Sequence, residues 1–303
     1  MEEMKIGIIG ADTSHVIAFT DLINNPQNPG HIPGGRVVAV FPGGSPDMPI
    51  SRDRVEGFTK ELSEKHNVEI CPSIEVLASK VDAVLLESAD GRLHLEQFRK
   101  IADTKKPVFI DKPFAVSRDD AVEIKNIALK NQAPVFSSSS LRYDKNICEE
   151  WTSDKDGPVI GAQAYGGAEY TEGVPGLFWY GIHSAEILFS MMGSGCKCVS
   201  CIGNDDADIV VGTWKDGRIG TLRGIRKGKA QFGCLVYREN NIKNIPATTD
   251  GTGYYGLVEN IMNFFHTGTS PVPLDVTIEI ISFLEAANKS KAAGGKEYPC
   301  SGT

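Results

Sequence analysis

Short apolar runs alternate with helix-like segments through the first 137 residues, and this alternation constrains the fold more than any other feature. The apolar runs are residues 5–9, 36–41, 68–71, 83–86, 108–110 and 135–136. Parallel strands require crossover connections, and amphipathic helices usually supply them. Because such crossovers are right-handed, the pattern predicts an α/β, Rossmann-like, doubly wound parallel sheet over residues 1–137.

The second half of the chain has a different pattern. Several strand-like segments follow one another, with helical segments at 181–192, 255–267 and 276–293. Gly217 favours a tight reversal between two of these strands. We therefore expect residues 138–303 to form an α+β domain with an open, mainly antiparallel sheet that binds substrate and mediates oligomerisation, as a homodimer or homotetramer.

Composition excludes several classes of protein. The 303 residues favour two domains, and the net charge of -8 with a pI near 5.3 argues against a nucleic-acid partner. No apolar run approaches the ~20 residues that span a bilayer, and the first residues lack the pattern of a secretory signal. An odd number of cysteines, seven, fits a reducing cytoplasm. Cys196, Cys198 and Cys201 lack a second ligand pair, so no metal site is expected.

The turn after the first apolar run resembles a dinucleotide fingerprint with two changes. Gly10 occupies the first glycine position of G-x-G-x-x-G, whereas Asp12 and His15 replace the second and third. A carboxylate ~5 Å from a phosphate would cost about 3 kcal/mol at an effective dielectric of ~20. Asp12 can instead point away and cap the helix, and Thr13 and Ser14 can donate hydroxyl hydrogen bonds to phosphate.

The end of the second apolar run lacks the acid that normally binds the adenosine ribose. Phe41 is followed by a Pro/Gly-rich turn that contains Ser45. Ser45, Arg52 or Arg54 can contact a 2′-phosphate instead. NADP(H) is therefore expected at least as readily as NAD(H).

Two further stretches carry candidate catalytic residues. Lys112 follows the apolar run 108–110 and would lie at the carboxyl edge of the sheet, where ligands bind in open α/β folds. The alternative is a solvated lysine paired with Asp111. His183 lies early in the helix expected at 181–192, with Glu186 one turn later, and a histidine can act as general acid or base near neutral pH. Its alternative role is capping or packing.

With these residues the chain resembles the glucose–fructose oxidoreductase / inositol dehydrogenase / MocA (Gfo/Idh/MocA) family of NAD(P)-dependent oxidoreductases, as a divergent member. Asp111-Lys112-Pro113 is similar to the family's Glu-Lys-Pro motif. Residues 88–97 are similar to the turn and helix after its fourth strand, 157–161 to the first strand of its second domain, and 260–268 with 275–294 to its closing helices.

The resemblance implies hydride transfer between a nicotinamide cofactor and a sugar, inositol or related hydroxy compound. It implies that Lys112 contacts the substrate oxygen and the cofactor ribose, and that His183 is the acid/base. Trp179 stands where the family's pattern has an aspartate, so other groups must orient the substrate. The candidates for this role are Tyr143, Trp179, Tyr180 and Glu186, together with Arg142.

The expected cofactor contacts come from the turns at the carboxyl edge of the predicted sheet. They are Gly10, Asp12, Thr13, Ser14, His15, Phe41, Ser45, Glu87, Ser88, His94, Asp111, Lys112 and Pro113. The leading hypothesis is an NAD(P)-dependent dehydrogenase acting on CH–OH groups. The alternatives are a non-redox or regulatory ligand-binding relative, and a lyase or epimerase that oxidises its substrate transiently.

Overall fold

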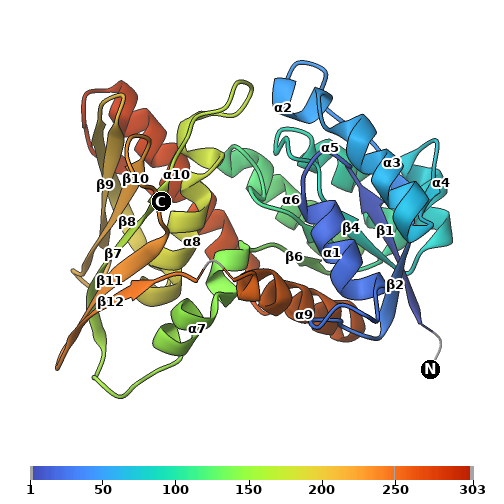
Figure 1. Ribbon diagram of the computed structural model, residues 1–303. Helices are drawn as coiled ribbons and strands as arrows, with labels where there is room; N and C mark the ends of the chain where they lie inside the picture. The colour runs from blue at the N-terminus through green and yellow to red at the C-terminus, as the bar shows by residue number, and fades with distance from the viewer. Residues whose placement is uncertain (1–2, 249, 301–303) are drawn as a thin grey trace. The chain divides into compact units, whose positions relative to one another are not determined.

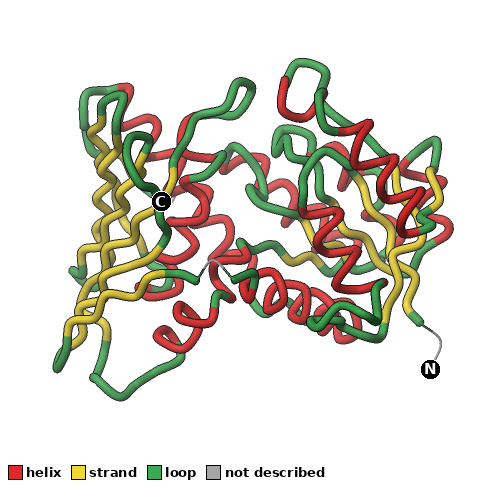
Figure 2. The backbone as a smooth tube through the Cα atoms, in the orientation of Figure 1, coloured by secondary structure: helices red, strands yellow, loops and turns green. Residues whose placement is uncertain are grey.

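The computed structural model describes residues 3–248 and 250–300, and the chain forms two compact units (Figures 1 and 2). The first unit comprises residues 1–115, 119–138 and 254–274. The second comprises residues 116–118, 139–253 and 275–303. Each unit is described by itself.

A six-stranded parallel sheet forms the centre of the first unit. Its strands are β1 (Met4–Ile9), β2 (Gly35–Phe41), β3 (Glu69–Ile70), β4 (Ala83–Leu86), β5 (Val108–Ile110) and β6 (Val135–Phe136), in the order β3-β2-β1-β4-β5-β6. All neighbours pair in parallel. The predicted Rossmann-like α/β sheet is confirmed, and the strand order reverses at β1, which is where such folds bind ligands.

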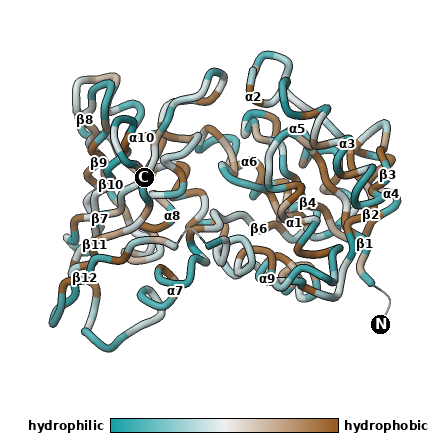
Figure 3. Tube along the Cα trace, in the orientation of Figure 1, coloured by the Kyte–Doolittle hydropathy of each residue, from teal (hydrophilic) through white to brown (hydrophobic). Residues whose placement is uncertain are grey.

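Apolar side chains of the strands and helices make the core of this unit. β4 is buried along its whole length, and hydrophobic residues gather on β1 and β4 (Figure 3). Buried strands of this kind read as continuous apolar runs because both faces of the sheet are covered. The helices of the unit are α1 (His15–Asn24), α2 (Pro49–Arg52), α3 (Val55–His66), α4 (Ile74–Lys80), α5 (His94–Arg99), α6 (Arg118–Asn131) and α9 (Thr252–Thr267), with a 3-10 turn η1 (Ala102–Thr104).

The first residues of α4 and α3 differ in whether a side chain caps the helix. Ser73 caps α4, because its hydroxyl accepts a hydrogen bond from the Val76 amide at 3.2 Å. Ser51 and Asp53 are also residue types that cap helices, and they precede the helix that ends at His66, but the structure has two helices there. Ser51 lies within α2, and Arg54 occupies the cap position of α3 without a side-chain bond.

Residues 254–274 belong to the first unit, whereas the sequence pattern placed the second domain at 138–303. The Phe264 ring of α9 packs against Phe136 of β6 at 5.6 Å, and Tyr254 packs edge-on against His15 and Phe19. An amphipathic helix shows which of its faces is buried but not which core receives it. The chain enters the second unit at residues 116–118, returns to the first unit, and crosses again after Ser138.

A seven-stranded mixed sheet forms the second unit. Its strands are β7 (Val159–Gly167), β8 (Cys196–Gly203), β9 (Ala207–Trp214), β10 (Ile219–Ile225), β11 (Gly233–Arg238), β12 (Ile242–Pro246) and β13 (Tyr298–Pro299), in the order β12-β11-β7-β10-β9-β8-β13. Only β7 and β10 pair in parallel among these described strands. The mainly antiparallel sheet is confirmed, and Gly217, with φ +89°, makes the reversal between β9 and β10.

Helices of the second unit pack on this sheet. They are α7 (Lys145–Trp151), α8 (Gly181–Met192) and α10 (Leu274–Ala292), with 3-10 turns η2 (Ser140–Tyr143) and η3 (Gly176–Phe178). α8 is almost entirely buried and contacts β7, β10 and β11. Within the described residues, no helix combines the length and hydrophobicity needed to cross a bilayer.

Candidate functional site

The turns after β1, β4 and β5 meet at the carboxyl edge of the first sheet. The amide of Glu87 donates to the Ile9 carbonyl at 2.7 Å, and the amide of Asp111 donates to the Leu86 carbonyl at 2.8 Å. The hydrogen-bond ladder therefore continues one residue past each strand. This places the residues that follow β1, β4 and β5 side by side at the switch point of the sheet.

Gly10 starts the turn between β1 and α1. Its φ is +88°, and a Cβ atom built on it would lie 2.3 Å from the Ser88 Oγ and 2.5 Å from the Ser88 amide nitrogen. Only glycine fits this approach and this backbone conformation. α1 then begins at His15, with Ser14 exposed at the cap position and no side-chain cap bond. The amides of His15 and Val16 form only long hydrogen bonds, at 3.4 Å, to the hydroxyl and the carbonyl of Thr13, so an anion can compete for them as in a phosphate-binding turn.

Asp12 does not cap α1. Its buried carboxylate accepts hydrogen bonds from the Ala89 amide at 2.8 Å and from the Ser51 hydroxyl at 2.5 Å. Burial raises the pKa of Asp12 despite these bonds. With the side chain held between Ala89 and Ser51, the start of α1 fits the pyrophosphate of a dinucleotide.

The segment after β2 is tied to the turn after β4. The buried Ser45 hydroxyl donates to Asp90, and the Arg92 guanidinium binds the same carboxylate at 2.7 and 2.8 Å. Although burial opposes it, these bonds hold the pKa of Asp90 below its usual range. Ser45 is therefore engaged within the protein. Phe41 is half-buried, and Arg52 and Arg54 are exposed.

The turn after β5 carries the predicted Asp-Lys-Pro motif. Lys112 is half-buried and precedes a cis peptide bond to Pro113. His94, which is fully buried, contacts the carbonyls of Ser88 at 2.8 Å and of Phe114 at 3.3 Å. It therefore connects the turns after β4 and β5.

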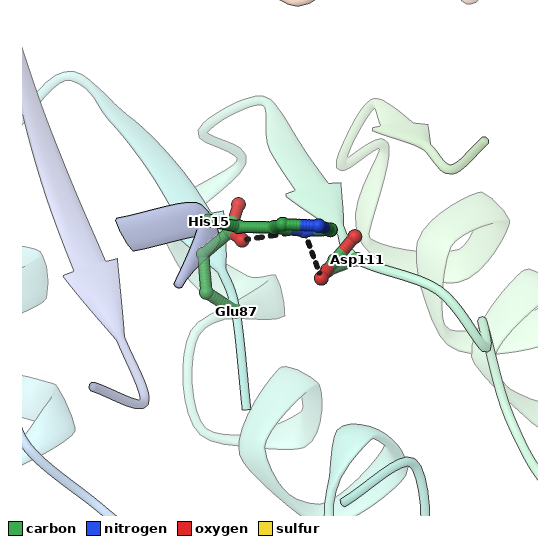
Figure 4. A group of neighbouring side chains, drawn as sticks. All are labelled: His15, Glu87 and Asp111. Carbon is green, nitrogen blue, oxygen red and sulfur yellow. Dashed lines mark hydrogen bonds and ion pairs between the residues drawn. The ribbon is translucent and has the colours of Figure 1, made fainter. Parts of the chain in front are cut away.

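Three buried side chains converge where these turns meet: His15, Glu87 and Asp111 (Figure 4). The His15 Nδ1 lies 2.8 Å from Asp111 Oδ2 and 3.9 Å from Glu87 Oε2. Burial, and then the neighbouring Asp111, raises the pKa of Glu87 well above its usual range. The pKa of Asp111 is about 2, because His15 and Lys112 stabilise its charged form against the effect of burial.

The second unit holds His183 at the first turn of α8. Its Nδ1 lies 2.7 Å from the Ser139 hydroxyl, and Tyr180 and Phe232 contact its ring edge-on at 5.7 and 5.5 Å. The hydroxyl and the two rings fix the imidazole orientation. An oriented and half-buried histidine of this kind can accept or donate a proton at Nε2.

The expected substrate-orienting residues lie in different environments. Glu186 is buried, and its carboxylate pairs with the Arg142 guanidinium at 2.8 Å. Trp179 is 8% exposed and contacts the Tyr180 ring at 5.9 Å, whereas Tyr180 is 39% exposed. Tyr143 is half-buried at the end of η2. The Glu186–Arg142 pair makes these two residues structural partners of one another.

The sequence did not predict the residues that contact the candidate site residues: Ser51 contacts Asp12, Asp90 contacts Ser45, and Ser139 and Phe232 contact His183. They lie far along the chain from Asp12, Ser45 and His183, and no spacing rule connects them. Lys112 belongs to the first unit and His183 to the second, so each is placed only within its own unit.

Residues 48–139 match the model of the Gfo/Idh/MocA group, described as an oxidoreductase family with an NAD-binding Rossmann fold. The match includes the turns after β4 and β5 and leaves the Gly10–His15 turn outside it. No curated protein sequence matches the chain. The resemblance to the Gfo/Idh/MocA family is confirmed.

Solved structures of dehydrogenases share the fold. The scyllo-inositol dehydrogenase of Lactobacillus casei, with bound NAD(H) and scyllo-inositol, has a TM-score of 0.81 at 12% identity, covering 99% of both chains. The myo-inositol dehydrogenase of the same organism, with NAD(H) and myo-inositol, has a TM-score of 0.79 at 17% identity, covering 100% of this chain and 98% of its own. A probable dehydrogenase from Thermotoga maritima has a TM-score of 0.80 at 16% identity, covering 98% and 99%. At such identities the similarity establishes the fold.

Proposed function

We propose that this chain, a divergent relative of the Gfo/Idh/MocA oxidoreductases, is an NAD(P)-dependent dehydrogenase that acts on a CH–OH group of a sugar, inositol or related compound. The observation that carries the proposal is the pairing of two features at one sheet edge. A glycine turn leads into α1 after β1, and the Asp-Lys-Pro turn follows β5, with β4 between them. The first feature suits a pyrophosphate, and the second supplies a cation for a reacting oxygen.

The proposed roles follow from the chemistry of each side chain. A bound nicotinamide would accept or return the hydride. The Lys112 ammonium would hold the substrate hydroxyl oxygen, and His183 would take the hydroxyl proton at Nε2. Ser139, which contacts Nδ1, would keep the imidazole in position for that transfer. Trp179 would shield the substrate from water rather than replace the family's aspartate.

Titration with NADH and NADPH, followed by the fluorescence of the reduced nicotinamide, tests this proposal. We expect binding of at least one of the two, and Lys112→Ala and His183→Ala should lower turnover of an inositol or sugar panel far more than cofactor affinity. Lys125→Ala, which removes a lysine from α6, is the matched control and should leave both unchanged. Absence of binding to either dinucleotide would exclude the function.

One observation favours a second candidate, a ligand-binding relative that no longer uses a dinucleotide. The Asp12–Ser51 and Ser45–Asp90 hydrogen bonds hold the segment after β2 against the turns where the adenosine half of a dinucleotide would lie. If this candidate is correct, a sugar or inositol should raise the melting temperature while NAD(H) and NADP(H) do not. Ser51→Ala, which removes one of the two hydrogen bonds that hold this segment, should then restore part of the dinucleotide binding.

The proposal also includes a homodimer or homotetramer in the cytoplasm. Open, mainly antiparallel sheets often pair across their uncovered face, and the second unit contains such a sheet. Light scattering coupled to gel filtration measures the mass directly. A mass equal to that of one 32.8 kDa chain at micromolar concentration would contradict the oligomer.

A further inference from the structure

We propose that His15, Glu87 and Asp111 form a binding site for one divalent metal ion of the Mn²⁺ or Zn²⁺ type. Their ligand atoms all lie within 4.8 Å of one another, and all three residues are buried (Figure 4). The residues come from the first turn of α1 and the turns after β4 and β5. The site lies wholly within the first unit, and the inference does not rest on the proposed dehydrogenase activity.

The second observation is that the buried carboxylate of Glu87 lacks hydrogen-bond partners. Glu87 is 0% exposed, and neither of its oxygens forms a hydrogen bond with the described residues. The His15 Nδ1 lies 3.9 Å from its Oε2. Asp111 Oδ1 also lacks a hydrogen-bond partner. Buried polar groups are nearly always satisfied, so these oxygens indicate a ligand that bonds to them.

The distances suit a small cation. Ligands about 2.1 Å from a metal lie about 3.0–3.5 Å from one another in octahedral or tetrahedral geometry. The His15–Asp111 and His15–Glu87 separations of 2.8 and 3.9 Å bracket this range. The first is a hydrogen bond in the structure, so the metal would replace it and bind the imidazole in the tautomer that carries its proton on Nε2, with small side-chain rotations. Phe19 stacks on the His15 ring at 5.1 Å and Tyr254 contacts it edge-on at 5.2 Å, which limits rotation of the ring.

The charges and the ligand types select the ion. Two carboxylates and a neutral imidazole balance a divalent cation, so the buried site becomes neutral. Lys112 and Asp12 also act on Glu87, Lys112 lowering its pKa and Asp12 raising it. An imidazole with two carboxylates favours Mn²⁺, Fe²⁺ or Zn²⁺ over Ca²⁺, which prefers oxygen ligands alone. Three protein ligands leave at least one position open for water or a ligand oxygen.

Calorimetric titration of the chelator-treated protein with Mn²⁺ and with Zn²⁺, in the absence of any dinucleotide, tests this site. We expect one ion per chain and at least a tenfold loss of affinity in Glu87→Gln, which keeps the size of the side chain. Glu150→Gln is the control, because Glu150 is also buried but pairs with Arg238 in the second unit, at 2.5 Å. It should bind the ion as the wild type does.

Pulsed EPR of the Mn²⁺ complex of the wild type supplies a readout that needs no variant. Coupling to one imidazole nitrogen is expected, and it should disappear in His15→Gln. Failure to bind either ion, equal affinity in Glu87→Gln and the wild type, or a Mn²⁺ spectrum without nitrogen coupling would each overturn the proposal. In those cases Glu87 is a buried, protonated acid. Because no dinucleotide is present, none of these results bears on cofactor binding.

Discussion

Replacing Gly10 with alanine should destabilise the first unit by about 2–5 kcal/mol. The glycine has φ +88°, where an L-residue costs about 1–2 kcal/mol. The added Cβ would also lie 2.5 Å from the amide nitrogen and 2.6 Å from the Cα of Ser88. These are backbone atoms that cannot rotate away, and overpacking of this kind costs about 1–3 kcal/mol more.

Gly44→Ala separates the two contributions. Gly44 belongs to the same unit and has φ +100°, but its Cβ would meet only Val55 side-chain atoms at 3.5–3.6 Å, an ordinary contact. The Gly44→Ala variant should therefore lose only about 1–2 kcal/mol of stability, which is the cost of placing an L-residue at this positive φ.

The assay must report on the first unit. All three tryptophans, at positions 151, 179 and 214, belong to the second unit, so tryptophan fluorescence is unsuitable. Urea unfolding followed by circular dichroism, together with hydrogen exchange of the β1 and β4 amides, measures the free energy directly. Equal losses in Gly10→Ala and Gly44→Ala would refute the close approach of the β1 and β4 turns.

Three further changes test other parts of the structure. Although burial opposes it, hydrogen bonds from Arg226 and two other residues lower the pKa of Asp208, so its stabilising charge is present above pH ~4 and lost on acidification. Asp208→Asn should cost about 3 kcal/mol at pH 7 in urea unfolding, and a difference that does not shrink below pH 4 would contradict this. Burial raises the pKa of Cys234 to about 12, so iodoacetamide at pH 8 should label this thiol only when urea unfolds the protein. Mass spectrometry detects the label. In Gly166→Ala the new Cβ would lie 2.1 Å from the Phe232 ring, which should lower stability by about 1–3 kcal/mol. Because Phe232 contacts the His183 ring, the NMR signals of that imidazole should shift, and unchanged signals would contradict this packing.

The sequence predicted the architecture well where the signal is local. Continuous apolar runs such as 83–86 indicate a strand buried on both faces, and they lie at the centre of the sheet. β12 was missed because its alternating residues are half-exposed at a sheet edge and include Lys243 and Pro246. Residues two apart in a regular strand share a face, but an irregularity in the pairing of β8 separates Cys196 from Cys198, so Cys196 is buried and Cys198 half-exposed.

The candidate site was predictable only in part. The rule that ligands bind at the carboxyl edge identified His15, Glu87 and Asp111 one by one. It could not show that their side chains converge, because that depends on how each turn leaves its strand. The same limit applies to Asp12, whose partner Ser51 lies 39 residues away in the short helix α2.

The return of α9 to the first unit bears on the order of events during synthesis. The β-sheet of that unit is complete by Phe136, yet part of the apolar surface beside it waits for Phe264. A ribosome must therefore translate residues 139–253, which belong to the other unit, before the first core can close. A fragment ending at residue 138 would carry an unsealed hydrophobic surface and should require a chaperone or aggregate. The two units are therefore interleaved along the chain, and the first residues to emerge must wait for α9 before their core is complete.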